Sequence, residues 1–216
     1  HSTSQSKIGN SSIHFEQESK HELAATHFLR VADHADWDFG TGGDLTIEGW
    51  VYFKNNGASN NYDNLFYMSG SFQIARQQSS NKLYSFTGSN SGAESSGTLT
   101  NNAWHHIAVC RHSGTMYGYV GGVIKFQYSD TTDLDYTTTL KIGSSAGNSS
   151  WFLQELRVSN TARYPSGTTF TPHTSAHSSD SNTKLLIQSN PTNLHSGAYG
   201  TAQSDGKKYY YTDIKG

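Results

Sequence analysis

Short segments in which apolar and polar residues alternate recur along the whole chain, and this pattern constrains the fold more than any other feature. In the clearest segment, residues 44–54, every second residue from Leu45 to Phe53 is apolar or glycine. Successive side chains of a β-strand point to opposite faces, so this alternation is typical of a strand. No helical pattern of ten or more residues is present. The chain is therefore expected to be all-β.

About a dozen short strands are expected, separated by loops rich in Asn, Ser and Gly. The expected strands are residues 13–17, 27–32, 44–54, 64–69, 72–77, 82–87, 103–111, 115–120, 123–127, 139–143, 152–159 and 184–188. The main loops are expected at residues 55–61, 88–97 and 144–150. Gly121 and Gly122 indicate a two-residue hairpin, because glycine accepts the positive φ of primed turns. This spacing predicts a two-sheet antiparallel jelly-roll sandwich.

The chain becomes polar after the last expected strand. Residues 1–188 are expected to form one jelly-roll domain, because 216 residues suit a single domain of the larger sort. Residues 189–216 are expected to be a polar linker or C-terminal tail that can add an edge strand. The first residue is not methionine, which favours a segment of a longer protein.

Charge and cysteine content exclude several classes of function. The formal net charge is -2, so no excess of positive charge exists to neutralise phosphates, and nucleic-acid binding is not expected. No apolar run approaches the roughly 20 residues that span a bilayer, and membrane insertion is not expected. Cys110 is the single cysteine, which excludes an intrachain disulfide and a multi-cysteine zinc site.

Several motifs, in order along the chain, resemble the laminin-G-like members of the concanavalin A-like lectin/glucanase superfamily. They are DWDFG at 36–40, GDLTIEGWV at 43–51, WHHIAV at 104–109, YVGGV at 119–123, LKIG at 140–143 and ELRVSN at 155–160. This resemblance covers about residues 5–188 and implies the jelly-roll fold. A narrower resemblance, in STSQSKIGNSSIHF near the start and in KLLIQSN and YYYTDIKG near the end, is to laminin-G-like modules in virion proteins of marine bacteriophages.

The resemblance implies a non-catalytic, lectin-like binding and adhesion module in a phage fibre or appendage protein. Its implied location is the virion or the extracellular space. Its implied partners are glycan or cell-surface carbohydrate and neighbouring virion subunits. The alternatives are a carbohydrate-binding module of a secreted protein, a polysaccharide lyase or hydrolase, and a spacer that binds nothing.

Enzyme activity is not expected, and no catalytic residue is assigned. Glycoside hydrolysis needs two carboxylates on either side of one bond, about 5–5.5 Å or 6.5–9.5 Å apart. Neither Glu48 nor Glu155 has an acidic residue two positions away, and the E-x-D-x-E run of the superfamily's hydrolases is absent. The segment QELR at 154–157 partly matches a strand of related lyases, but the accompanying Gln-Ile-His strand is absent.

Calcium is the candidate cofactor, because hard cations prefer carboxylate and carbonyl oxygens. Asp63 and Asn64 resemble the Asp-Asn pair of the pentraxin branch and are the candidate metal ligands. The matching second loop, residues 143–150, contains no acid. Alternative acidic ligands are Asp33, Asp36 and Asp38, or Asp130 and Asp133.

The 11 histidines raise the question of a second kind of metal site. His173 and His177 are four residues apart, but the segment around them, TPHTSAHSSD, is not helical in character. His105 and His106 are expected on opposite faces of one strand, so they cannot share an ion. The histidines are therefore interpreted as surface or packed residues.

Ligand contact is expected at loops on one rim of the sandwich, because loops vary freely on a rigid scaffold. Sugars combine apolar faces with hydroxyl groups, so an aromatic ring beside amides suits them. The candidate ligand-binding residues are Asn61, Tyr62, Asn148 and Trp151. Trp151 follows a polar loop directly, which favours exposure at the rim, although a tryptophan there can also cover the end of a sheet.

Overall fold

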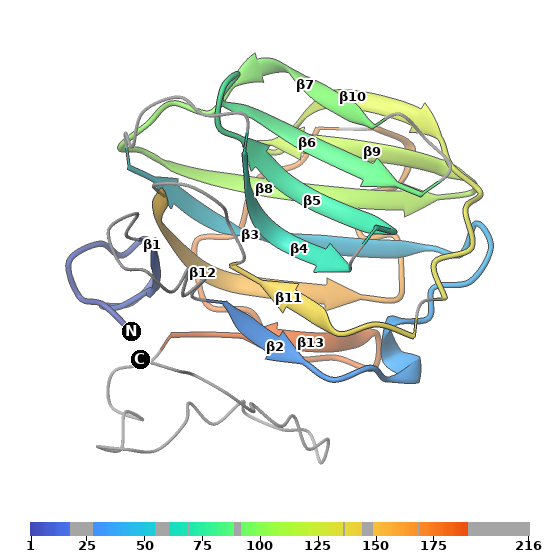
Figure 1. Cartoon of the computed structure of the whole chain (residues 1–216), viewed down its shortest axis with the longest axis horizontal. Coiled ribbons are helices and arrows are strands. Elements are labelled where there is room, and N and C mark those ends of the chain that lie inside the picture. The colour runs from blue at the N-terminus through green and yellow to red at the C-terminus, as the bar shows by residue number, and fades with distance from the viewer. Residues whose placement is uncertain are drawn as a thin grey trace.

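Two antiparallel β-sheets face each other in the computed structural model, as Figure 1 shows. The structure describes residues 1–17, 28–54, 61–68, 70–88, 92–135, 137–143, 149–167 and 169–189. The six-stranded sheet has the order β2 (Leu29–Val31), β11 (Leu140–Ile142), β4 (Tyr62–Met68), β5 (Phe72–Gln77), β6 (Lys82–Thr87) and β7 (Ala93–Thr98).

The seven-stranded sheet has the order β1 (Ile13–Gln17), β12 (Ser149–Ser159), β3 (Leu45–Phe53), β8 (Trp104–His112), β9 (Thr115–Val120) and β10 (Val123–Ser129). Its remaining strand, β13 (Thr183–Ile187), pairs with the second half of β12. Two 3-10 turns, η1 (Ala35–Trp37) and η2 (Pro165–Gly167), are the helical elements among the described residues. Within that part of the chain, no helix is long and apolar enough to cross a bilayer.

The predicted all-β sandwich is confirmed, and many local details agree with the sequence patterns. Four strands, β1, β5, β6 and β9, have the predicted bounds. Gly121 and Gly122 connect β9 to β10 with φ of 60° and 77°, the backbone conformation that a primed turn requires.

Two predicted loops are partly strands. Residues 88–97 were expected to be a loop, but β7 begins within them and pairs with β6. Its sequence, AESSGT, is small and polar and therefore carries no hydrophobic alternation. The loop expected at residues 144–150 ends early, because Ser149 and Ser150 already pair with β1. Pairing with a neighbouring backbone, rather than local side-chain pattern, makes these residues strands.

A continuous apolar core fills the space between the two sheets, and Trp151 lies inside it. Its indole ring packs against Phe15 and Phe53, with ring centroids 4.7 and 5.5 Å away, and it has no exposed surface. The predicted exposure of Trp151 at the rim is therefore wrong. Because side chains alternate along β12, Trp151 points inward on the same face as Leu153, which is also in the core.

The described residues between β12 and β13, 160–167 and 169–182, cover the central part of the outer face of the seven-stranded sheet, and we call them the covering segment. A second apolar cluster forms there around Ala108, Cys110 and Tyr119, against which Tyr164 and Phe170 pack. The rings of Tyr164 and Phe170 stack with centroids 3.5 Å apart. The central part of this sheet face is therefore buried. The tail predicted at residues 189–216 lies, beyond residue 189, outside the described residues.

Candidate functional site

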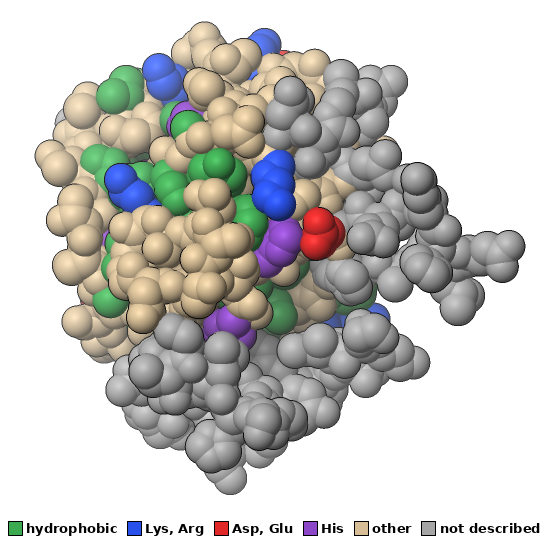
Figure 2. Space-filling view, turned by 90° about the vertical axis from the view of Figure 1, so that its left-hand side faces the viewer, with side chains coloured by type: hydrophobic (Ala, Val, Ile, Leu, Met, Phe, Trp, Pro, Cys, Tyr) green, Lys and Arg blue, Asp and Glu red, His purple; other side chains and the backbone are tan. Residues whose placement is uncertain are grey.

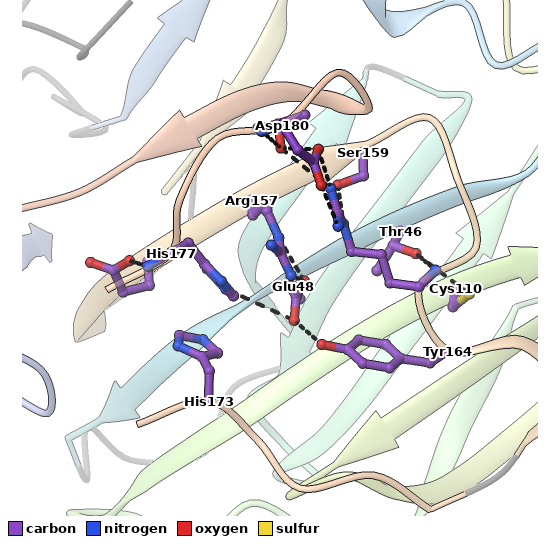
Figure 3. Close-up of polar contacts among 12 residues, drawn as sticks. Thr46, Glu48, Cys110, Arg157, Ser159, Tyr164, His173, His177 and Asp180 are labelled. Carbon is purple, nitrogen blue, oxygen red and sulfur yellow. Dashed lines mark hydrogen bonds and ion pairs between the residues drawn. The ribbon is translucent and has the colours of Figure 1, made fainter. Parts of the chain in front are cut away.

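A buried polar cluster lies between the seven-stranded sheet and the covering segment (Figure 3). Glu48 on β3 is at its centre, and Arg157 on β12 lies directly across the strand pair from it. Tyr164, His173 and His177 reach the same place from the covering segment. Glu48 is on the outer face of β3 because the alternating positions Ile47 and Val51 enter the core.

The Glu48 carboxylate is fully buried and has several partners. Its Oε1 accepts hydrogen bonds from Arg157 Nε at 2.9 Å and Nη2 at 2.5 Å. Its Oε2 accepts one from the Tyr164 hydroxyl at 2.6 Å and lies 3.3 Å from His106 Nε2. Burial alone would raise the pKa of Glu48, but His106, Arg157 and Tyr164 together outweigh it and hold that pKa well below its usual range. Glu48 is therefore a buried carboxylate anion.

The two histidines of the covering segment lie against this anion. The His173 and His177 rings have centroids 3.6 Å apart, and His177 Nε2 is 4.0 Å from Glu48 Oε2. Burial lowers the pKa of both imidazoles, that of His177 to about 3. Both rings are therefore neutral near pH 7.

Contacts around His177 fix the position of its backbone. Glu155 occupies a bulge of β12, with φ of 54°, where the register against β3 shifts. Its carboxylate accepts hydrogen bonds from the His177 backbone N–H at 2.7 Å and from Gln188 Nε2 at 2.8 Å. Gln188 also donates to the His177 carbonyl. Burial raises the pKa of Glu155.

Sequence reasoning did not find this cluster. The spacing of His173 and His177 was visible, but it was judged against a helix, whereas both residues lie in an irregular segment. The spacing was a usable signal. Their proximity to Glu48, far away in the sequence, is a tertiary contact that no local pattern encodes.

The residues predicted for the rim have different positions. Asn148 lies outside the described residues, and Trp151 is in the core. Asn61 is half-buried, and its backbone carbonyl accepts a hydrogen bond from Gln78 N at 2.9 Å. Tyr62 is half-buried too, with its ring 4.9 Å from that of Tyr84.

The two predicted rim segments nevertheless meet, because the Ser149 hydroxyl donates a hydrogen bond to the Asp63 carboxylate. Asp63 is fully buried, and its Oδ2 accepts hydrogen bonds from Arg76 Nε at 2.7 Å and from Nη2 at 2.5 Å. Its Oδ1 also accepts one from Gln78 Nε2 at 2.8 Å.

This arrangement of Asp63 does not fit a calcium ion, which needs six to eight oxygen ligands turned toward it. Asn64 Oδ1 is likewise turned toward a donor, Gln73 Nε2, at 2.5 Å. Among the alternatives, Asp36 pairs with Lys184 at 3.4 Å. Calcium binding elsewhere on the chain stays a prediction.

The buried Asp130 has a similar role to Asp63. Its Oδ2 lies 3.1 Å from Arg111 Nη1, and its Oδ1 accepts a hydrogen bond from the Thr87 hydroxyl at 2.8 Å. These contacts join a strand of each sheet, β8 and β6. Asp130 therefore serves the interior of the sandwich.

Half-buried aromatic and amide side chains share the outer face of the six-stranded sheet. We call this set the tyrosine face: Tyr62, Tyr67, Gln73, Gln77, Tyr84 and Phe86. The register places them together, since Tyr67, Gln73 and Phe86 lie in one row across β4, β5 and β6. Tyr62 lies opposite Gln77 on the same face. In Figure 1 these three strands form the front of the sandwich.

A family model described as the concanavalin A-like lectin/glucanases superfamily (Laminin_G_3) matches residues 24–166. The chain belongs to this superfamily. The resemblance of its strand motifs is thereby confirmed at the level of the superfamily. A comparison of this chain with curated protein sequences found no match.

Solved structures share the fold of this superfamily member. The binding domain of Paraclostridial Mosquitocidal Protein 1 has a TM-score of 0.59 at 16% identity, over 70% of this chain and 40% of that one. A proposed carbohydrate-binding protein from Bacteroides ovatus ATCC 8483 has a TM-score of 0.56 at 14% identity, over 81% and 51%. A structure of botulinum neurotoxin type C has a TM-score of 0.55 at 13% identity, over 70% and 39%. The present chain thus spans about half, or less, of the length of these three proteins.

Proposed function

We propose that this chain is a non-catalytic carbohydrate-binding module and that the tyrosine face is its ligand surface. The observation that carries the proposal is the grouping of four half-buried aromatic rings with two glutamine amides on one sheet face. Tyr62 and Tyr84 are neighbours on this face, with rings 4.9 Å apart and inclined by 40°. Tyr62, together with the neighbouring Asn61, stays a candidate ligand residue.

The chemistry of this face suits a sugar. Aromatic rings offer flat apolar surface to the C–H faces of a pyranose, and the glutamine amides offer both donors and acceptors to its hydroxyls. Lys82 lies opposite Gln77 on β6 and adds a donor at the border. Rigid strands hold these groups, so little side-chain order has to be gained on binding.

The acid on the outer face of the seven-stranded sheet is held in a way that supports a non-catalytic module. The superfamily includes glucanases, so the distinction depends on the site itself. Glu48, the acid at the centre of the seven-stranded sheet, has no exposed surface and is bound to Arg157 and Tyr164. A carboxylate that is ionised, buried and bound to an arginine has no proton to donate and cannot reach a glycosidic oxygen.

Two further observations favour a glycan ligand. The structure of botulinum neurotoxin type C, which shares this fold, is described in terms of cell entry that depends on two ganglioside molecules. Figure 2 shows that, at one end of the sandwich, side chains of Lys, Arg, Asp and Glu are few and lie apart from one another. A surface with few charges suits a neutral ligand better than a highly charged one.

The setting that we propose is a fibre or appendage protein of a phage virion, where the module would contact surface glycan or a neighbouring subunit. The support is the resemblance of the opening segment, residues 2–15, to modules of marine phage virion proteins. A secreted carbohydrate-binding protein is the alternative setting. Repetition on a virion would raise a weak single-site affinity through effective concentration.

The test is a glycan array followed by titration of the best ligand with wild type and three variants. Tyr62→Ala and Tyr84→Ala should each weaken binding at least about tenfold, equivalent to about 1.4 kcal/mol. Tyr52→Ala is the matched control, because Tyr52 is a half-buried tyrosine on the outer face of the other sheet. Equal affinity of all three variants would refute the tyrosine face, and hydrolysis of any arrayed glycan would refute the non-catalytic assignment.

A further inference from the structure

We propose that Glu48, His173 and His177 bind a divalent transition-metal ion, with Zn²⁺ as the representative ion. This site is separate from the proposed carbohydrate surface, because it lies on the outer face of the seven-stranded sheet. Among the described residues, these three form the one group of metal-ligating side chains whose donor atoms all lie within 4.8 Å of one another. Figure 3 shows both imidazole rings beside the Glu48 carboxylate.

The imidazole nitrogens that face the cluster have no hydrogen-bond partner. His173 Nδ1 donates to the Ser175 carbonyl at 2.8 Å, so in the neutral ring Nε2 carries the lone pair. That Nε2 is buried and unpartnered, as is Nε2 of His177. Buried polar atoms are nearly always paired with a protein group, a water molecule or an ion, so these two imidazole nitrogens point to a bound group beside them.

The histidine arrangement matches the way proteins prepare metal ligands. A ligating histidine usually donates its other ring N–H to a carbonyl or carboxylate, which fixes the tautomer and the ring orientation. His173 has this contact to Ser175. For His177 the backbone is held by Glu155 and Gln188. His177 exposes 6% of its side chain, so the site lies just beneath the surface.

The two oxygens of the Glu48 carboxylate face different groups. Arg157 binds Oε1 of Glu48, whereas Oε2 faces the imidazoles. A metal-bound imidazole must be neutral, and the Nε2 lone pair is then free to bind the ion. Tyr164 donates to Oε2 and can keep this hydrogen bond while the oxygen's second lone pair binds the ion. A cation thus meets one negative charge and two neutral nitrogen donors.

Two imidazoles and a carboxylate select a borderline ion over a hard one. Zn²⁺ binds this donor set, whereas Ca²⁺ takes oxygen ligands almost exclusively. With Zn–N and Zn–O distances of about 2.0–2.2 Å, tetrahedral ligands lie about 3.3–3.5 Å apart. The donor atoms here, within 4.8 Å of one another, need a contraction of about 1.5 Å or less. Rotation of the His173 and His177 side chains would supply this contraction.

A third imidazole, that of His106, lies beside the same carboxylate. His106 is fully buried, and its Nε2 lies 3.3 Å from Glu48 Oε2. Its ring centroid is 5.3 Å from that of His173. A water molecule or His106 would take the fourth position. The bound ion would fasten residues 160–182 to β3.

The test uses the whole chain, stripped with EDTA and titrated with Zn²⁺ by calorimetry and with Co²⁺ by visible absorption. We expect one ion per chain and the intense ligand-field bands of four-coordinate Co²⁺. A hundredfold excess of Zn²⁺ over Kd should raise the folded-to-unfolded ratio about a hundredfold. Excess Ca²⁺ should leave the Co²⁺ bands unchanged, because Ca²⁺ takes oxygen ligands almost exclusively. Absence of Zn²⁺ binding by the wild type would overturn the proposal.

Variants locate the site. His173→Ala and His177→Ala should each weaken Zn²⁺ binding at least about tenfold, since even the loss of a residue that supports a ligand costs about that much. His105→Ala is the matched control, because His105 is half-buried on β8 and its Nε2 is hydrogen-bonded to the Thr100 carbonyl at 2.9 Å. Unchanged binding in the His173→Ala/His177→Ala double variant would overturn the proposal. If the variants do not fold, NMR of the wild type decides, and absence of Zn²⁺-dependent shifts of both imidazoles overturns it.

Discussion

Replacing Trp151 with alanine tests the reassignment of this residue from the rim to the core. The side chain has no exposed surface and packs against Phe15 and Phe53. A buried aromatic removes about 150–250 Å² from water, which at about 25 cal/mol per Å² is worth about 4–6 kcal/mol. The indole N–H is buried without a hydrogen-bond partner, so its removal returns about 1–3 kcal/mol. The difference is about 1–5 kcal/mol, and such truncations usually cost about 3–5 kcal/mol, so we expect a net loss of about 3–4 kcal/mol for Trp151→Ala.

Urea unfolding followed by circular dichroism measures this loss at 25 °C. In a domain of this size each kcal/mol lowers Tm by about 2–4 °C, so Tm should fall by about 6–16 °C. Trp151→Phe should lose only about 1 kcal/mol, because it keeps a packed ring and removes the unpartnered N–H.

Tyr62→Ala is the control for Trp151→Ala, because Tyr62 is half-buried on a sheet face outside the core, and it should lower the free energy of unfolding by about 1 kcal/mol or less. A loss below about 1 kcal/mol for Trp151→Ala, with an unchanged m-value, would refute the burial argument. Loss of glycan binding in a stably folded Trp151→Ala protein would restore Trp151 as a ligand residue.

Two predictions concern the other buried groups. Asp63→Ala should cost about 3–5 kcal/mol, equally in EDTA and in Ca²⁺, because it leaves the buried Arg76 unpaired; the exposed control Asp133→Ala should cost about 0.5 kcal/mol or less. A Ca²⁺-dependent stabilisation that Asp63→Ala abolishes would instead make Asp63 a calcium ligand. Burial raises the pKa of Tyr119 and raises that of Tyr128 to about 12, so their contribution to stability is complete below pH about 10 and is lost as pH rises toward the folded values. An absorbance titration should show these tyrosines ionising only with unfolding, and normal titration of all 13 tyrosines in the folded protein would contradict it.

The fold class is encoded locally and was therefore accessible from the sequence. Alternation of period two decides that a segment is a strand, and Gly121-Gly122 decides where a hairpin turns, because both depend on the backbone of a few adjacent residues. The strands that alternation missed, β7 and the start of β12, consist of small polar residues. Pairing with β6 and β1 makes them strands, and a partner distant in the sequence leaves no local pattern.

Which face of each strand enters the core, and what covers the other face, was decided by the tertiary structure. The sequence by itself determined that Glu48 and Trp50 share a face of β3 and that His173 and His177 are four residues apart. It did not determine that residues 160–182 fold over that face and bring both histidines to Glu48, nor that Trp151 points inward. Burial is a property of the assembled layers, because desolvation of a side chain depends on all its neighbours, and those neighbours come from segments far apart in the chain.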